Sequence, residues 1–282
     1  MKKISIYSNA KINFGLYITE KRADGFHSIE TLFYPIRLRD TITFEMADSF
    51  SFTTGHPVLL DELEHNLIVK AVRLLEQETG KPIPVKIHLE KLVPLGAGLG
   101  GGSSNAAITL LSLNELFKLQ IKKEDIAKLA LLLGSDVPFF LHPQPAIGKG
   151  RGEILERIEF EIRKPILIVN PGIHVSTKWA YENCKPGMPE TNLHEVIRQE
   201  TVDYAVYNGV IKNDFERVVF RAFPEIKELK EKLLSLGAEF ALMSGSGSTV
   251  FGIFPNLESA EAASRQLPNR YFRFIDTDSE EE

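Results

Sequence analysis

The chain has 282 residues, of which 33 are Lys or Arg and 38 are Asp or Glu, so its formal net charge is −5. Hydrophobic residues make up 43% of it and charged residues 25%, which is typical of a globular protein and excludes a disordered or fibrous one. The acidic balance argues against a dedicated nucleic-acid binder, because contacts to phosphates require a cationic surface. The single cysteine, Cys184, excludes an internal disulfide, and no Cys/His cluster has zinc-ligand spacing.

The apolar stretches of the sequence are too short to suggest a signal peptide or a membrane-spanning helix. The N-terminal sequence has no apolar stretch long enough for a signal peptide. The longest apolar run, LALLL at 129–133, is far shorter than the ~20 residues that span a bilayer. We therefore expect a cytoplasmic protein without a membrane partner, built as one large domain or two ordinary ones.

The first predicted element is a strand near the N-terminus whose apolar face is formed by Ile12, Phe14, Leu16 and Ile18. Lys11 and Asn13 share its other face, where periodicity alone allows either a functional role or ordinary exposure to solvent. A turn is predicted at 24–26, an Asp-Gly-Phe triplet, and His27 follows it directly. A lone histidine is more often a structural hydrogen-bonding residue than a catalyst.

Glycine is concentrated in two places. Five of the seven residues from Gly96 to Gly102 are glycine, between a strand predicted at 85–89 and a helix that Ser103 or Ser104 is expected to cap. A strand, a glycine loop and a helix N-terminus form an anion site, because the backbone N–H groups and the helix dipole favour negative charge. The second cluster, SGSGS at 244–248, precedes a predicted strand at 249–254 and is either a structural β-turn or a closure over a ligand.

Three motifs compete for the first loop. The Walker A pattern fails, because no Gly-Lys-Ser/Thr follows the glycines. A dinucleotide-binding GxGxxG matches at Gly96, Gly98 and Gly101, but the acidic residue expected ~20 residues later falls inside the predicted helix. The whole string PLGAGLGGGSSNAA at 94–107 resembles the phosphate loop of the GHMP kinases.

Four further motifs narrow this resemblance. They are AKIN, KRADGFH, GSDVPFF at 134–140 and MSGSGSTVF at 243–251, and they occur in the order typical of the 4-diphosphocytidyl-2-C-methyl-D-erythritol kinases. The resemblance implies an α+β, two-domain GHMP kinase architecture with the active site in the cleft between the halves. It predicts a ribosomal-S5-like, ATP-binding domain at 1–160 and a ferredoxin-like, substrate-binding domain at 161–282.

The resemblance also implies a reaction. Members of this family transfer the γ-phosphate of ATP, with Mg²⁺, to the 2-hydroxyl of a cytidine diphosphate derivative of methylerythritol in non-mevalonate isoprenoid biosynthesis. Asp136 matches the catalytic aspartate and Lys11 the catalytic lysine. The pair suits phosphoryl transfer, which needs a proton acceptor and a cation near the transferring group. The alternative for Asp136 is a cap before Val137-Pro138.

Binding roles follow from the same matching. The ATP-binding positions are Pro94, Gly96, Gly98, Gly100, Gly101, Gly102, Ser103, Ser104, Asn66 and Lys91. The substrate-binding positions are Asn13, Phe26, His27, Thr177, Tyr181, Gly245 and Gly247. A serine hydroxyl of the loop is the only protein group that we expect to reach Mg²⁺, and no protein ligand is assigned to the metal.

Several of these residues have a structural alternative. Asn66 is otherwise a helix cap, Lys91 a solvated charge and Tyr181 a core aromatic on a helix. The family usually has Tyr where this chain has Phe26, which keeps the face that stacks on a base and loses the hydroxyl.

The second half of the chain is predicted to alternate between strands and helices. Strands are expected at 165–170, 240–244 and 249–254, helices at 176–183, 191–200, 224–236 and 258–266, and a solvated acidic tail from 276. The alternatives in function are another GHMP small-molecule kinase, a non-catalytic nucleotide-binding module on the same fold and an NAD-binding oxidoreductase. The sequence does not decide the oligomeric state.

Overall fold

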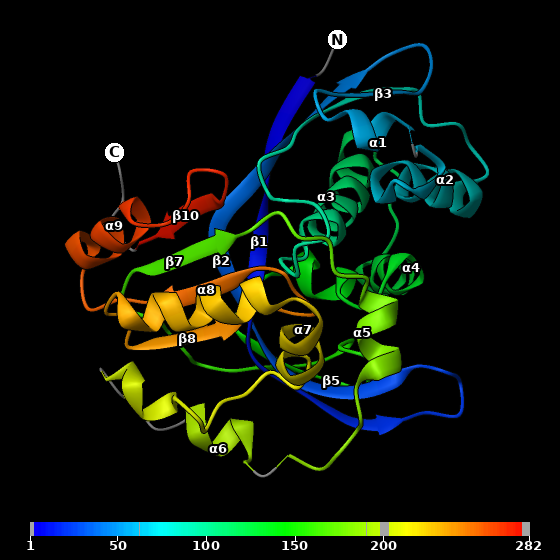
Figure 1. Cartoon of the computed structure of the whole chain (residues 1–282). Helices are drawn as coiled ribbons and strands as arrows, with labels where there is room; N and C mark the ends of the chain where they lie inside the picture. Colours follow the sequence, from blue (N-terminus) through cyan, green and yellow to red (C-terminus); the bar gives the residue numbers. More distant parts are fainter. Residues whose placement is uncertain (1–2, 62, 190, 198–202, 278–282) are drawn as a thin grey trace. The chain divides into compact units, whose positions relative to one another are not determined.

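The computed structural model describes residues 3–61, 63–189, 191–197 and 203–277 (Figure 1). The chain forms two compact units, and neither is continuous in sequence. The first unit contains residues 1–11, 36–95 and 100–143, and the second contains residues 12–35, 96–99 and 144–282. The chain therefore changes unit inside each of its first two strands and again at both ends of residues 96–99. The domain boundary expected near residue 160 stays a prediction.

Two long strands, β1 (Lys3–Lys21) and β2 (His27–Met46), pair with each other and contribute residues to both units. In the first unit, β2 pairs antiparallel with β4 (Val85–Glu90), from Thr41 opposite Glu90 to Met46 opposite Val85. β3 (Ser51–Thr54) adds parallel to β4. The alternation of VKIHLE along β4 buries its three apolar residues and exposes its polar ones, as the pattern predicts.

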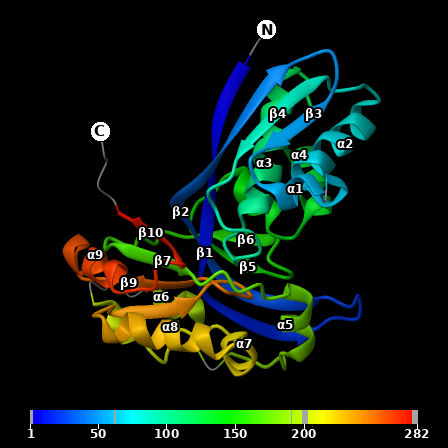
Figure 2. The same ribbon diagram turned by 45° about the horizontal axis from the view of Figure 1, so that its top comes forward.

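The helices of the first unit gather around α3 (Gly101–Leu116), which contacts α2 (Leu67–Thr79), α4 (Lys123–Leu133) and the 3₁₀-helix η2 (Val137–Leu141). α1 (Pro57–Asp61) and η1 (Leu63–His65) precede α2. Figure 2 shows β3 and β4 next to each other beside these helices. Small residues and leucines let α3 be buried along most of its length, so its N-terminus is firmly placed.

The second unit contains an antiparallel sheet of β7 (Ile166–Asn170), β8 (Phe240–Met243), β9 (Val250–Ile253) and β10 (Phe272–Asp276), in the order β10-β7-β9-β8. α8 (Pro224–Ser235) packs against β8 and β9, and α9 (Leu257–Arg265) packs against β7 and β10 (Figure 1). Buried residues of both helices share one core with Leu167, Val169 and Met243, so both cover the same face. This β-α-β-β-α-β arrangement is ferredoxin-like, as predicted.

The rest of the second unit adds two short strands and several helices. β5 (Ala146–Lys149) pairs with β2 and with β6 (Ile154–Arg157). The helices are α5 (Thr177–Asn183), α6 (Leu193–Ile197), η3 (Tyr204–Tyr207) and α7 (Glu216–Ala222). Of the helix predicted at 191–200, residues 198–200 lie outside the described residues.

Two further expectations concern the C-terminal tail and membrane-spanning helices. The acidic tail does not begin at 276, because Asp276 ends β10 opposite Ile166 and is buried; residues 278–282 lie outside the described residues. Among the described helices, none is both long and apolar enough to cross a membrane.

Candidate active site

The first glycine loop leads directly into α3. Gly100 is the N-cap residue, with a φ of 70° and no side-chain cap, so the prediction that Ser103 or Ser104 caps the helix is wrong. Glycine adopts this left-handed conformation without strain, and a Cβ at Gly100 would come within 2.6 Å of the Phe140 ring, so the N-cap position suits glycine. The N–H groups of the first turn therefore have no acceptor inside the helix and form an anion site.

The two serines of this first turn differ in their surroundings. Ser104 is buried, and its hydroxyl lies 2.8 Å from that of Ser8, which also donates to Asn105 Oδ1 at 2.7 Å. Ser103 is partly exposed and forms no side-chain hydrogen bond within the described chain. The Ser103 hydroxyl is therefore available to a ligand, whereas Ser104 anchors the helix start. Ser8 was not predicted, although it lies two residues before buried Ala10 on the same face of β1.

Lys11 and Asp136 lie together in the first unit. The Nζ atom of Lys11 is 3.6 Å from Asp136 Oδ2, and the side chains are 3% and 34% exposed. The alternative of a solvent-facing Lys11 is therefore wrong. Asp136 does stand before η2 as its N-cap residue, but its side chain makes no capping hydrogen bond, so the carboxylate is not used as a cap. Burial lowers the pKa of Lys11, and the charge and hydrogen bond of Asp136 act in the opposite direction.

This ion pair lies next to the start of α3. A Cβ built on Gly100 would be 3.2 Å from Lys11 Cε, so the lysine stem runs along the N-cap residue. A buried ammonium, a partly exposed carboxylate and outward-pointing N–H groups thus meet at one end of the helix.

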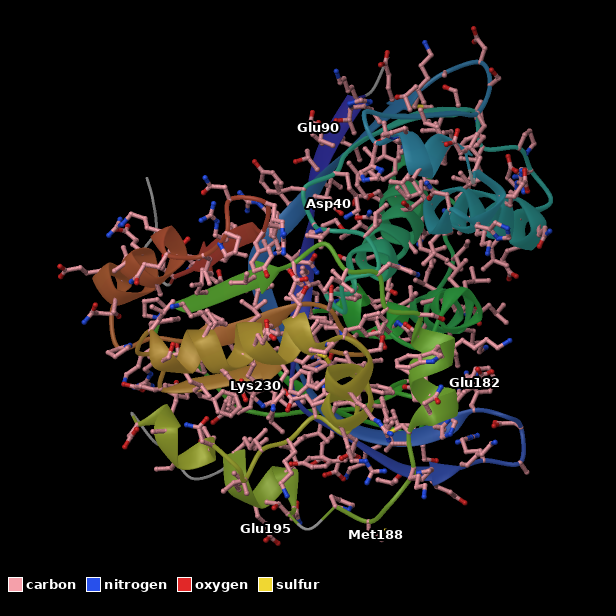
Figure 3. The ribbon with its side chains drawn as sticks, in the orientation of Figure 1. Asp40, Glu90, Glu182, Met188, Glu195 and Lys230 are labelled. Atoms are coloured by element: carbon pink, nitrogen blue, oxygen red, sulfur yellow. The ribbon has the colours of Figure 1, made fainter. Side chains whose placement is uncertain are left out.

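Lys91 is the second buried lysine of the first unit. Its Nζ is 2.8 Å from Oδ2 of Asp40 and also donates to the Val93 carbonyl, and the two side chains are 4% and 0% exposed. The alternative of a solvated Lys91 is wrong. Burial lowers the pKa of Lys91, opposed by Asp40. Asp40, labelled in Figure 3, accepts two further hydrogen bonds, from the amides of Leu92 and Val93.

Asp40 was missed by sequence reasoning, although a signal was present. It follows Ile36 and Leu38 and precedes Ile42 at intervals of two, so a charged residue stands on an otherwise apolar face of β2. The pair with Lys91 fixes the segment that enters the glycine loop. Pro94, in that segment, is partly buried.

Asn66 is a helix cap, as its structural alternative states, but only the oxygen of its side-chain amide is used for capping. It is the N-cap of α2, and its Oδ1 accepts from the amide of Ile68 at 2.9 Å. Its Nδ2 is buried and has no hydrogen-bond partner within the described chain. A buried amide left without an acceptor is a costly arrangement that a bound ligand would relieve.

In the second unit the two glycine clusters touch through their backbones. A Cβ on Gly98 would overlap the carbonyl oxygen of Ser244, and a Cβ on Gly245 would lie 3.1 Å from Gly98 Cα. The Ser244 hydroxyl donates to the Gly98 carbonyl at 2.9 Å and accepts from the amide of Asn13 at 3.1 Å. Gly96 and Gly247 also have positive φ angles, of 60° and 104°. Residues 96–99 and 244–248 therefore form one glycine-lined junction.

Replacing Gly98 by alanine is expected to lower the free energy of unfolding by more than about 2 kcal/mol. The residue has a φ of 76°, and the added methyl group would displace backbone rather than a flexible side chain. Gly55→Ala is the matched control, since a Cβ there meets nothing within 4 Å. Urea denaturation of both variants measures the difference, and equal stabilities would show that the junction is not tightly packed.

Asn13 is buried in the second unit, with 2% of its surface exposed, so the alternative of a solvent-facing side chain is wrong. Its Nδ2 donates to Thr31 Oγ1 at 2.8 Å. A Cβ built on Gly245 would lie 3.4 Å from Asn13 Oδ1, so the amide oxygen is on the side of the second glycine cluster.

The predicted turn at 24–26 is present, and the Phe26 side chain in it is exposed to solvent. The amide of Arg22 donates to the Phe26 carbonyl at 2.9 Å, and Gly25 has a φ of 86°. Phe26 is 51% exposed, and the guanidinium carbon of Arg151 lies 4.6 Å from the centre of its ring. Phe26 is therefore an exposed aromatic face rather than a core residue.

His27 and Tyr181 form a second aromatic group. Their rings stack with centroids 5.1 Å apart and planes at 20°, and Tyr181 also packs edge-on against Phe215 at 4.9 Å. Tyr181 is thus a helix aromatic that packs partly on the core, and its ring also stacks on His27. Burial, and to a lesser degree the charge of Lys21, lowers the pKa of His27, which favours the neutral ring with one donor and one acceptor.

Thr177 begins α5 and contacts the second glycine cluster. Its hydroxyl lies 2.8 Å from the Ser246 hydroxyl. Of the substrate positions expected from the sequence, Asn13, Thr177, Gly245 and Gly247 therefore lie at or beside the glycine-lined junction. His27 and Tyr181 form the stacked pair, and Phe26 lies at the turn before it.

No metal-binding cluster occurs among the described residues, where no group of three or more His, Cys, Asp or Glu side chains is placed to hold an ion. A cavity of about 430 Å³ does lie in the second unit, but none of the predicted site residues lines it. Its walls come from Tyr17 and from residues in the ranges 184–191 and 210–217.

Comparison with known proteins gives two family matches. Residues 66–144 match the model described as the GHMP kinases N terminal domain, and residues 197–273 match the GHMP kinases C terminal model. The first match contains Asn66, Lys91, the first glycine loop and Asp136. The second contains the glycine cluster at 244–248.

Individual relatives are similar over most of the chain. A 4-diphosphocytidyl-2-C-methyl-D-erythritol kinase of Bacteroides fragilis is 44% identical over 88% of this chain and 91% of its own length. The protein of the same name from Chlorobium phaeobacteroides is 42% identical over 94% of each chain. A crystal structure of 4-(cytidine 5'-diphospho)-2C-methyl-D-erythritol kinase matches with a TM-score of 0.81 and 33% identity, covering 98% of this chain and 100% of the other.

Proposed function

Because the chain belongs to the 4-diphosphocytidyl-2-C-methyl-D-erythritol kinase family of the GHMP kinases, we propose that it phosphorylates the 2-hydroxyl of 4-diphosphocytidyl-2-C-methyl-D-erythritol with ATP. The protein is a kinase that acts on an alcohol, in non-mevalonate isoprenoid biosynthesis. Family membership excludes the NAD-binding oxidoreductase. The substrate and ATP are small charged molecules, so no nucleic acid or membrane takes part, and we place the reaction in the cytoplasm.

One observation carries the chemistry of this proposal. The buried Lys11 lies 3.6 Å from the partly exposed Asp136, beside the N-cap residue of α3. The free N–H groups of the first helical turn bind phosphate oxygens, and the helix dipole adds to that attraction. What distinguishes this pair from the fully buried Lys91–Asp40 pair is that the Asp136 carboxylate is partly exposed, so a substrate hydroxyl can reach it.

The two residues divide the work of phosphoryl transfer. The Asp136 carboxylate orients the substrate hydroxyl and accepts its proton as the hydroxyl oxygen bonds to the γ-phosphorus. The bond between the γ-phosphorus and the bridging oxygen of ATP breaks in the same step, and ADP leaves. Lys11 stabilises the negative charge of the transferring phosphoryl group and that of the Asp136 carboxylate. Burial keeps water away from the lysine, so its field is stronger there than in solution.

The donor set also fits Mg²⁺ brought in with ATP. Mg²⁺ keeps several waters and takes few protein ligands beside the phosphates, so a site without three clustered carboxylates is compatible with it. The available Ser103 hydroxyl is the group that would hold it, directly or through water. When bound, the ion neutralises charge on the β- and γ-phosphates.

Binding roles follow from the surroundings of each residue. On the ATP side, the unpartnered Asn66 Nδ2 supports a contact with adenine, and the glycines and serines of 96–104 bind the triphosphate. On the substrate side, Phe26 and Tyr181 bind the cytosine and the neutral His27 reads its edge. Asn13 and Thr177 contact the methylerythritol and diphosphate groups, over which Gly245 and Gly247 close.

Replacing Phe26 by alanine is expected to weaken binding of the cytidyl substrate by roughly 1–3 kcal/mol, the worth of one base–aromatic contact. The side chain is half exposed, so the fold should not suffer. Calorimetric titration with the substrate measures the change, and Phe26→Tyr is the matched control that keeps the ring. Unchanged affinity in Phe26→Ala would contradict the stacking role.

The proposed function is tested by coupled ADP release from the purified protein with Mg²⁺-ATP and a series of alcohols. We expect turnover with the cytidyl substrate and at least 100-fold lower kcat/KM, on the order of two lost polar contacts, with mevalonate or homoserine. Comparable turnover of either alcohol would favour another GHMP kinase. ADP release that is independent of any acceptor would contradict the proposal.

A further inference from the structure

Thr31 is a fully buried residue of β2 that neither the sequence motifs nor the proposed mechanism uses. Its hydroxyl is 2.6 Å from the carbonyl oxygen of Gly15 and 2.8 Å from Asn13 Nδ2. All three residues belong to the second unit. Thr31 therefore links the side chain of a proposed substrate contact to the backbone of β1.

The two hydrogen bonds of Thr31 can run in only one donor-to-acceptor direction. A carbonyl oxygen accepts and never donates, so the single hydroxyl proton of Thr31 goes to Gly15. The Thr31 oxygen then has only lone pairs left, and its second neighbour must be a donor. Asn13 consequently turns its NH₂ group to Thr31, and its Oδ1 is directed elsewhere.

The direction of that oxygen is given by the glycine junction. A Cβ on Gly245 would lie 3.4 Å from Asn13 Oδ1, while the Asn13 amide donates to Ser244 Oγ. Asn13 thus presents an acceptor on the side of the cluster 244–248. A substrate hydroxyl can donate its proton to this oxygen, whereas an NH₂ group in the same place could only donate to the hydroxyl's lone pairs and would leave its proton without this acceptor.

We propose that Thr31 is a positioning residue, which fixes the amide of Asn13 so that its oxygen accepts a hydrogen bond from a hydroxyl of the polyol substrate. The inference rests on the proposed function, since it names the group that selects an alcohol at that site. Without the Thr31 hydroxyl the two orientations of the amide become similar in energy, and part of the protein presents the wrong group.

The test compares Thr31→Val, which keeps the shape and removes the hydroxyl, with Thr31→Ser, which keeps the hydroxyl. In Thr31→Val we expect the KM for the cytidyl substrate to rise about 10-fold, the effect of one hydrogen bond, with the KM for ATP unchanged. Thr31→Ser should restore the wild-type KM within about 2-fold. Asn13→Ala and the double variant complete a cycle, and the effect of Thr31→Val should disappear once Asn13 is alanine.

Each outcome has a defined meaning. An unchanged KM in Thr31→Val, an equal defect in Thr31→Ser, or an undiminished effect in the Asn13→Ala background would overturn the positioning role. If Thr31→Val does not fold, Thr31→Ala, which also removes the hydroxyl, takes its place, and a wild-type KM in that variant would overturn the inference too. Failure of the wild-type protein to phosphorylate the cytidyl substrate would instead refute the proposed function.

Discussion

Asp136→Asn is expected to lower kcat by about 10²–10⁴-fold while ATP binds nearly as well as to the wild type. The amide keeps the size of the carboxylate and its position before η2, but it cannot take up the proton of the substrate hydroxyl. The side chain makes no capping hydrogen bond, so the substitution should not disturb the 3₁₀-helix. Single-turnover phosphorylation and calorimetric titration with ATP separate the chemical step from nucleotide binding.

The matched control for this variant is Asp125→Asn in α4. Asp125 also pairs with a lysine, Lys128, at 2.7 Å, but in an exposed pair of the kind that contributes little. We expect wild-type kcat in the control. Substantial turnover in Asp136→Asn would refute the role of Asp136, and an equal loss in both variants would point to a general electrostatic effect.

Lys11→Met is expected to reduce kcat by about 10²–10³-fold, the range found when one preorganised donor is removed from a charged transition state. Stability should be retained or increased. Burial holds the pKa of Lys11 in the folded protein below its unfolded value, so at neutral pH the protonated lysine opposes folding, and this penalty fades as the pH rises through the unfolded pKa. Asp136 remains partly hydrated when its partner is removed.

The same shift predicts a pH dependence. Because its pKa is lowered, Lys11 loses its proton at a lower pH than an ordinary lysine, and kcat of the wild type should fall on the alkaline side accordingly. Lys11→Met should lack this alkaline limb. Lys128→Met, which removes the exposed lysine, should keep both the wild-type kcat and the limb. A profile shared by all three proteins would show that another group titrates.

Local periodicity predicted the elements that carry the site. The alternation at Ile12, Phe14, Leu16 and Ile18 identified β1. The strands β7, β8 and β9 and the helices α8 and α9 were placed within a few residues, whereas β10 was not predicted. These features depend on neighbours two to four positions apart, and such patterns are visible in one sequence. The motifs that carry the resemblance placed Lys11 and Asp136, which the structure brings within 3.6 Å.

Features that depend on distant parts of the chain were not predictable in the same way. The buried partner of Lys91 is Asp40, 51 residues away, and β-strand pairing rather than local pattern brings them together. The N-cap of α3 is Gly100, where the Phe140 ring leaves no room for a Cβ, so the preference of serine for N-caps was misleading there. The alternation of the chain between two units follows from long strands that a scan for linkers does not detect.

The most direct test of the account is phosphorus NMR of the product formed by the wild type and by Asp136→Asn from Mg²⁺-ATP and 4-diphosphocytidyl-2-C-methyl-D-erythritol. We expect one new phosphomonoester signal per ADP, on the carbon-2 hydroxyl, from the wild type and almost none from the variant in the same time. A phosphate on another hydroxyl, ADP without a new phosphomonoester, or equal product from both proteins would contradict it.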